Sequence, residues 1–272
     1  MLTKITFPEY CALEGINAST LKSYAGDYFN PKQVAYNISH RDGAEKSHFT
    51  MGRAVHSALE HEGVLPDDEY VKCPYDNYKK KEAQEWKKEQ EDKGITPLKL
   101  AEYKQASDMA KQIWTNTPKE IQKVIHSVDA QREVSIQVDG YKAMYDLIHG
   151  EDLYDYKTTR RTKLKDIVND AFKLGYHIQA YHYCMVAAAE GLAVNDFYFI
   201  FVCTEAPHLV TTMRCTDNFI EAGHNAWQEA MDRYKKYHGI DYRELPSESD
   251  GIIELDVPEW ALEEEGELED FE

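Results

Sequence analysis

At 272 residues, 42% of them hydrophobic, the chain is long enough for one sizeable α/β domain or a domain with an insertion. It has no long apolar run, no secretory-type start and no clustered cysteines, so we expect a reduced, cytoplasmic protein without a membrane span, zinc site or disulfide framework. The net charge of −18 is unusual for a DNA-binding protein, but residues 259–272 carry eight of the acids and no base. We expect these residues to form a mobile tail behind a single domain of residues 1–258.

The first helix signal lies at Asn17-Ala-Ser-Thr, where Asn17 or Ser19 can cap a helix that contains Leu21. We expect Pro31 to end this segment. Capping the helix would by itself explain a serine at position 19. Free N–H groups at a helix N-terminus also bind phosphate, so Ser19 and Lys22 are candidate phosphate contacts.

Residues 51–62 have the apolar spacing of a helix, and His56 lies at the edge of its apolar stripe. Residues 63–130 are predicted to form an insertion or a helical lobe. This region contains Lys79, Lys80 and Lys81, followed by interleaved acids and bases that are typical of a solvated helix.

Residues 131–159 predict three consecutive antiparallel strands. Asp139-Gly140 is a strong two-residue hairpin signal, and residues 149–152 indicate a second turn. With Asp139-Gly140 as the loop, Glu133 lies opposite Asp146. With a symmetric second turn, Asp146 lies opposite Asp155.

These three carboxylates therefore share one rung of the sheet, and Lys157 shares the face of Asp155. Like charges directly opposite are destabilising, so the chain either bends its register there or holds a cation between the acids. Oxygen ligands of this kind suit Mg²⁺ or Mn²⁺, and Lys157 could orient or activate a water. The alternative is that these are ordinary charges on a solvated strand face.

The rest of the chain continues the alternation of helices and strands. Arg160, Arg161, Lys163 and Lys165 follow the third strand and could bracket a scissile phosphate, or form a charged loop. Residues 174–190 predict a helix that Gly191 ends, with Gln179 and Tyr183 on one face. Strands at 196–203 and 208–215 and a helix at 216–237 follow. We expect a mixed α/β fold with a central sheet flanked by helices.

Asp146 and Asp155-Tyr156-Lys157 resemble the D…(D/E)-x-K signature of the PD-(D/E)XK nuclease superfamily. The motif order over residues 15–240 is similar to that of the RecE-type exonucleases, relatives of the lambda exonuclease. One departure is Met144-Tyr145 before Asp146, where family members often carry a basic residue and a proline. The matching motifs are Asn17-Ala-Ser-Thr-Leu-Lys22, Gly52-Arg-Ala-Val-His56, Glu133, Asp155-Tyr-Lys-Thr-Thr159 and Gln179-Ala-Tyr-His-Tyr183.

The resemblance implies a Mg²⁺-dependent exonuclease, with Mn²⁺ as a substitute, that degrades linear double-stranded DNA from 5′ to 3′. It implies three groups of site residues. The metal ligands are His56, Asp146, Asp155 and the Tyr156 carbonyl; the catalytic group is Glu133, Asp146, Asp155, Lys157, Gln179 and Tyr183; the DNA contacts are Ser19, Lys22, Lys79, Lys80, Lys81, Thr158, Thr159, Arg160, Arg161 and Lys163.

The expected biological setting is phage recombination, with a single-strand annealing protein as partner and a homo-oligomeric ring of three or four copies. Two alternatives stay open at this point. One is an endonuclease or repair nuclease of the same superfamily, and the other is a DNA-binding subunit without activity. The complete set of His56, Glu133, Asp146, Asp155 and Lys157 argues against the inactive subunit.

Overall fold

The computed structural model describes residues 2–27, 29–40, 47–246, 252, 254, 256 and 257, with the backbone alone for residues 47–49. The acidic segment 259–272, predicted to be a mobile tail, lies outside these residues. Among the residues described, no helix has the length and apolar character that a membrane span requires.

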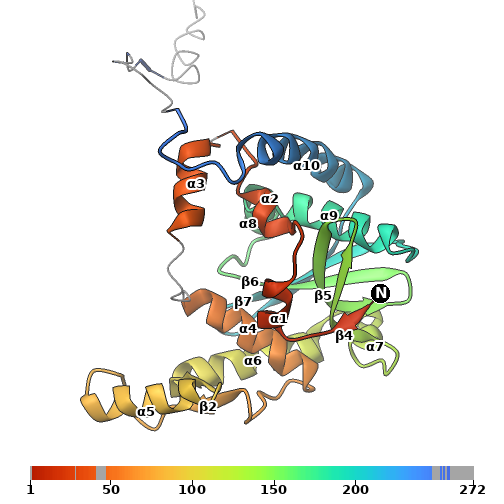
Figure 1. Ribbon diagram of the computed structural model, residues 1–272. Coiled ribbons are helices and arrows are strands. Elements are labelled where there is room, and N and C mark those ends of the chain that lie inside the picture. The colour runs from red at the N-terminus through yellow and green to blue at the C-terminus, as the bar shows by residue number, and fades with distance from the viewer. Residues whose placement is uncertain are drawn as a thin grey trace, which may run out of the picture.

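A six-stranded mixed sheet forms the centre of the molecule (Figure 1), in the order β1-β4-β5-β6-β7-β8. Among the described strands of this sheet, β6 and β7 pair in parallel and the other neighbours pair antiparallel. The predicted mixed α/β fold is thus confirmed. The strands are β1 (Thr3–Lys4), β4 (Gln131–Val138), β5 (Tyr141–His149), β6 (Asp152–Thr159), β7 (Phe197–Cys203) and β8 (Val210–Arg214).

Helices cover both faces of this sheet (Figure 1). On one face, α4 (Ser47–Glu60), α6 (Leu100–Asn116) and α7 (Lys119–Ile125) bury an apolar cluster with Tyr154 and Tyr156 of β6. On the other, α8 (Leu164–Lys173) and α9 (Tyr176–Ala189) pack on Leu153 and the phenylalanines of β7. The short α2 (Ala18–Lys22) and the long α10 (Asp217–Tyr237) pack against α9 through a third cluster.

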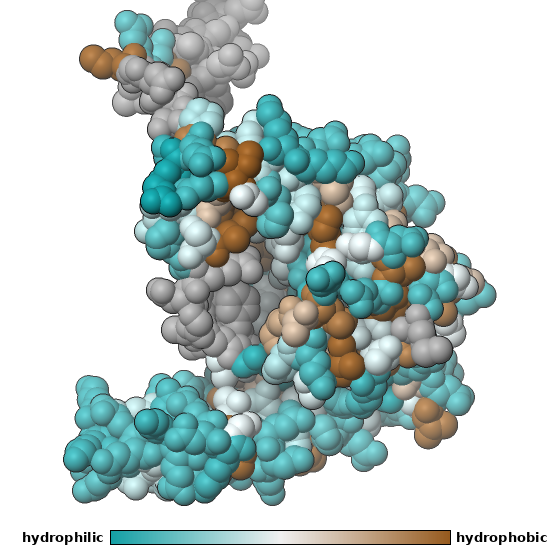
Figure 2. Space-filling view, in the orientation of Figure 1, coloured by the Kyte–Doolittle hydropathy of each residue, from teal (hydrophilic) through white to brown (hydrophobic). Residues whose placement is uncertain are grey.

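A smaller lobe projects from the α4–α6 side and lies at the lower left in Figure 1. It contains α5 (Lys81–Asp92) and a parallel pair of short strands, β2 (Tyr70–Lys72) and β3 (Thr96–Leu98). Tyr70 and Leu98 attach the lobe to the cluster around α6. The surface over α5 is almost uniformly hydrophilic (Figure 2), as the mixed-charge sequence predicts.

The N-terminal helices confirm one prediction and correct another. The Asn17 side chain accepts a hydrogen bond from the Thr20 N–H and caps α2, after α1 (Phe7–Ala12). Pro31 was predicted to end a helix, and this prediction is wrong, because Pro31 begins α3 (Pro31–Ser39) with Asn30 as N-cap. Proline lacks an N–H that the first helical turn would leave unpaired, so it fits there.

Candidate active site

The Asp139-Gly140 hairpin brings Glu133 and Asp146 opposite each other. The observed pairs Val138–Tyr141, Val134–Tyr145 and Arg132–Leu147 have the predicted register. The Glu133–Asp146 pair itself is missing from the ladder, and Glu133 has a φ of 49°. The backbone therefore bends where two like charges would otherwise be directly opposed, which is one of the two outcomes expected for this rung.

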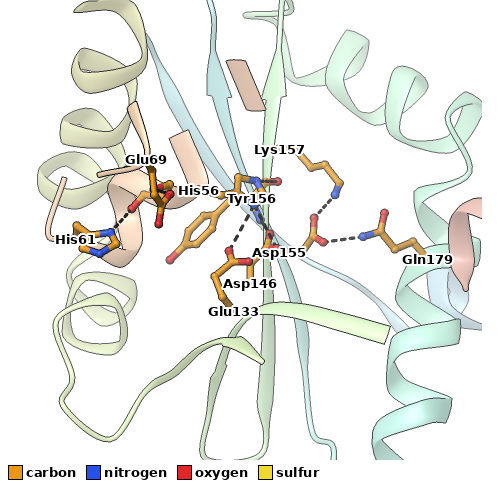
Figure 3. Close-up of polar contacts among 10 residues, drawn as sticks. His56, His61, Glu69, Glu133, Asp146, Asp155, Tyr156, Lys157 and Gln179 are labelled. Atoms are coloured by element: carbon orange, nitrogen blue, oxygen red, sulfur yellow. Dashed lines mark hydrogen bonds and ion pairs between the residues drawn. The ribbon is translucent and has the colours of Figure 1, made fainter. Parts of the chain in front are cut away.

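Strands β5 and β6 separate at the same level. Their pairing has the predicted register but stops at Leu147–Tyr154, one position before Asp146 and Asp155. The Asp146 carboxylate fills the opening, since its Oδ2 accepts a 2.6 Å hydrogen bond from the Tyr156 N–H (Figure 3). Asp155 stays in β6, held by parallel pairing with Phe199 of β7.

Helix α4 places His56 beside Glu133 and Asp146. Ala54, Val55, Ala58 and Leu59 are buried and fix α4 on the sheet, which directs His56 toward the opening. The His56 Nδ1 atom lies 3.3 Å from Asp146 Oδ1 and 3.8 Å from Glu133 Oε1, and Nε2 lies 3.1 Å from the Tyr156 carbonyl oxygen.

Ligand atoms of His56, Glu133 and Asp146 all lie within 4.8 Å of one another. Two carboxylates and an imidazole, next to the Tyr156 carbonyl, are a donor set that fits a divalent cation. The structure thus brings together two of the four predicted metal ligands, His56 and Asp146, and adds Glu133 to them, while the Tyr156 carbonyl contacts the other ring nitrogen of His56.

Burial and mutual charge shift the pKa values of His56, Glu133 and Asp146 in different directions. Burial lowers the pKa of His56, but the Asp146 and Glu133 carboxylates outweigh this effect and raise the pKa to about 9. Burial and the neighbouring Asp146 charge raise the pKa of Glu133 to about 8. Burial also opposes ionisation of Asp146, but His56 keeps the pKa of Asp146 below its usual value. The imidazolium thus supplies positive charge where a bound cation would supply it.

Asp155 belongs to a second set of contacts on the α9 side of β6 (Figure 3). Its Oδ1 accepts a 2.6 Å hydrogen bond from Gln179 Nε2, and its Oδ2 forms an ion pair with Lys157. Burial raises the pKa of Asp155 despite Lys157. For Lys157, burial is outweighed by Asp155 and Asp146, which raise its pKa, so Lys157 is an ammonium group.

Two aromatic rings support this ammonium group. Lys157 Nζ lies 5.2 Å from the ring centroid of Tyr176 and 5.9 Å from that of Phe199. Tyr176 was absent from the predicted site. Its position one helical turn before Gln179 is the signal that could have identified it.

Gln179 and Tyr183 were predicted to border the site together, and the structure gives them different surroundings. Gln179 contacts Asp155 directly. The Tyr183 ring packs on Tyr145 and Phe197 in the apolar cluster, and its backbone carbonyl accepts a hydrogen bond from the Tyr145 hydroxyl.

The predicted DNA contacts are dispersed. Ser19 is exposed on α2, and Lys79, Lys80 and Lys81 are exposed on the lobe that carries α5. Lys22 instead points inward to Gln179.

The bases after β6 border a separate cavity of about 390 Å³ between β6 and α8, which Thr158, Thr159, Arg160 and Arg161 help to line. Arg161 is paired with Asp170 of α8 at 2.7 Å, whereas Arg160 and Lys163 are exposed. The four bases were predicted either to bracket a scissile phosphate or to form a charged loop. The structure shows a loop that ends at Lys163, and the unpredicted α8 begins at Leu164.

Comparisons with known proteins bear on the fold and the family of the chain. No curated protein matches the chain in sequence. Among solved structures, a candidate exonuclease from Eubacterium rectale is 18% identical, with a TM-score of 0.61 over 96% of this chain and 98% of that one. A phage-related exonuclease from Haemophilus somnus is 10% identical, with a TM-score of 0.36 over 84% of this chain and 97% of that one, too low to inform the fold.

A family model matches residues 19–250, which include both strands that carry the paired acids, the α4 histidine and the α9 glutamine. The chain therefore belongs to the family described as PDDEXK-like domain of unknown function (DUF3799).

Proposed function

We propose that the protein is a divalent-metal-dependent exonuclease that degrades linear double-stranded DNA, from 5′ to 3′ as in the RecE-type enzymes it resembles. One observation carries the proposal: the Glu133–Asp146 rung, Asp155 and Lys157 converge at the opening between β5 and β6 of a PDDEXK-like domain. The Eubacterium rectale structure, described as a candidate exonuclease, supports the choice of reaction by analogy.

The proposed roles follow from the contacts. His56, Glu133 and Asp146 would hold the cation, with Asp155 and the Tyr156 carbonyl beside them. A bound Mg²⁺ or Mn²⁺ would supply a Lewis acid for the phosphodiester. Lys157 pairs with Asp155 beside the cluster, and we assign it the role of orienting or activating the attacking water.

The resemblance to the RecE-type enzymes also implies contacts with DNA and with other proteins. We propose that Arg160, Lys163 and the exposed Lys79–Lys81 contact phosphates, and that residues 1–258 form one nuclease domain with an insertion at 63–130. The acidic total favours a ring of three or four copies that surrounds the duplex, because a monomer with charge −18 has an unfavourable long-range field for DNA. A single-strand annealing protein is the proposed partner.

The test compares linear duplex with covalently closed circular duplex of the same sequence, in Mg²⁺ and in chelator, with label at either the 5′ or the 3′ end. We expect Mg²⁺-dependent release of mononucleotides from linear DNA, with the 5′ label released first. Cleavage of the closed circle would instead identify an endonuclease. DNA binding without cleavage in Mg²⁺ or Mn²⁺ would identify an inactive subunit.

A further inference from the structure

Two hydrogen bonds connect α2 to the strand that carries Asp155. Lys22 Nζ donates to Gln179 Oε1 at 2.9 Å, and Gln179 Nε2 donates to Asp155 Oδ1 at 2.6 Å. Burial and the nearby Lys157 charge lower the pKa of Lys22 to about 7, but the ammonium and the neutral amine can both donate to the oxygen of the Gln179 amide. The NH₂ of that amide is then the end that faces Asp155. Lys22 therefore fixes which way the Gln179 amide is turned.

The packing around Lys22 holds this contact in place. Leu21, its neighbour, is completely buried in the cluster that α2 forms with Ile178 of α9. The aliphatic part of Lys22 lies over Gly175, where an added Cβ would be 3.2 Å from Lys22 Cγ. Its ammonium lies 4.8 Å from the centroid of the Tyr176 ring, the ring that Lys157 also contacts. The side chain thus points into the site, although Ser19 on the same helix is exposed.

The hydrogen bond from Gln179 also affects the other oxygen of the carboxylate. With Oδ1 of Asp155 held by Gln179, the carboxylate plane is fixed and Oδ2 is directed at Lys157. An amide turned the other way would place its oxygen against a carboxylate oxygen, and Asp155 would have to rotate. The orientation of the Asp155–Lys157 pair thus depends on a residue that contacts neither of them by hydrogen bond.

We propose that Lys22 is a positioning residue that acts through Gln179 on Asp155, and not a contact for DNA phosphate. This inference rests on the proposed function for the chemistry it serves. Partners that orient metal-binding or catalytic groups typically contribute about 10- to 100-fold to metal affinity or activity. We therefore expect its loss to lower kcat and Mn²⁺ affinity while leaving the KM for DNA unchanged.

The experiment is a double-mutant cycle of Lys22→Met and Gln179→Met. The effects of substitutions on the activation free energy are additive when the two residues are independent and are not additive when the residues are coupled. We expect each single variant to lose about 10- to 100-fold in kcat. The double variant should be no worse than Gln179→Met alone. Lys22→Arg, which keeps a donor, should recover part of the loss. Lys173→Met removes an exposed lysine at the end of α8 and is the matched control.

A phosphate contact would give a different pattern. The effects of the two substitutions on activity would then be additive, and the KM for DNA would rise. The slope of log K for DNA binding against log salt concentration would fall in magnitude by about 0.9, the value for one phosphate. That pattern, or a Lys22→Met variant with parental kcat, would overturn the inference. The same cycle in Mn²⁺ affinity, measured by calorimetry, needs no cleavage. A parent that binds Mn²⁺ but cleaves no DNA would refute the proposed function alone.

Discussion

The Asp146→Asn substitution tests the metal group most directly. Asp146 is only 8% exposed and has two roles, since one oxygen faces His56 and the other accepts the Tyr156 N–H. Asparagine keeps an oxygen for the Tyr156 N–H but removes the charge. Alanine would leave that buried N–H without its acceptor at a cost of about 1–3 kcal/mol, so it would confuse folding with metal binding.

The size of the effect follows from mass action. At a Mn²⁺ concentration about 100 times its Kd, the parent should gain about 2.7 kcal/mol of stability, or about 5–10 °C in Tm for a protein of this size. Loss of a residue that only orients a metal ligand typically weakens metal binding by about 10- to 100-fold. Removal of one of the two carboxylate ligands themselves should therefore weaken Mn²⁺ binding at least about 100-fold. The Asn variant should then gain only about 0.4 kcal/mol, or about 1 °C.

The assay is differential scanning calorimetry of parent and variant, each in EDTA and in Mn²⁺. Asp129→Asn is the matched control, because Asp129 is an exposed carboxylate in the turn before β4 and should leave the Mn²⁺ gain at its parental size. Equal gains in the parent and in Asp146→Asn would refute the assignment of this group as the metal site.

Three further predictions follow from single contacts. Lys157→Ala should lower turnover by about 10²–10⁴-fold with metal affinity retained. Lys157→Arg should not restore turnover, because the guanidinium is bulkier than the ammonium that lies between Asp155 and Tyr176. An arginine variant with near-parental rate would show that charge alone suffices. The pKa values of about 9 for His56 and about 8 for Glu133 mean that both groups are largely protonated at neutral pH. Mn²⁺ binding should therefore release protons and strengthen from pH 6 to 8, as calorimetry in two buffers of different ionisation enthalpy would measure, whereas pH-independent affinity would exclude both groups as ligands. Gly223→Ala should destabilise the fold by about 1–3 kcal/mol in denaturant unfolding, because the added Cβ would lie 2.1 Å from the His177 carbonyl oxygen. Gly52→Ala is the control and should not destabilise the fold, because the space around Gly52 is open. Equal stability of the two variants would contradict the tight α9–α10 packing.

The central strands were predictable because their register is a local property. A two-residue hairpin at Asp139-Gly140 sets the register as far as Gln131–Ile148, and the sequence therefore placed Glu133 at the level of Asp146 correctly, although these two residues do not pair in the ladder. It could not show how the strain would be relieved. The left-handed backbone at Glu133 and the parting of β5 from β6 depend on the balance of repulsion and packing in three dimensions.

Long-range contacts account for most of what was missed. The role of Lys22 depends on a residue 157 positions away, and no periodicity within α2 indicates it. Helix α8 begins without a side-chain cap after a run of bases, so its start resembled a loop. Pro31 was misjudged for a local reason, since the same residue type that ends a helix also begins one when Asn30 stands before it.

The irregular rung in the hairpin has a consequence for how this chain can change. Intact pairs lie on both sides of it, Arg132–Leu147 and Val134–Tyr145, so the two carboxylates are fixed by the number of residues that separate each from the Asp139-Gly140 turn. A loop-borne site tolerates changes of length, but here a single inserted or deleted residue in either arm would bring a neighbour to the rung in place of an acid. The hairpin arms should therefore accept substitutions on their outer positions while rejecting insertions and deletions. Length variation should instead be tolerated in the β2–α5–β3 lobe, where no pairing with the central sheet would shift.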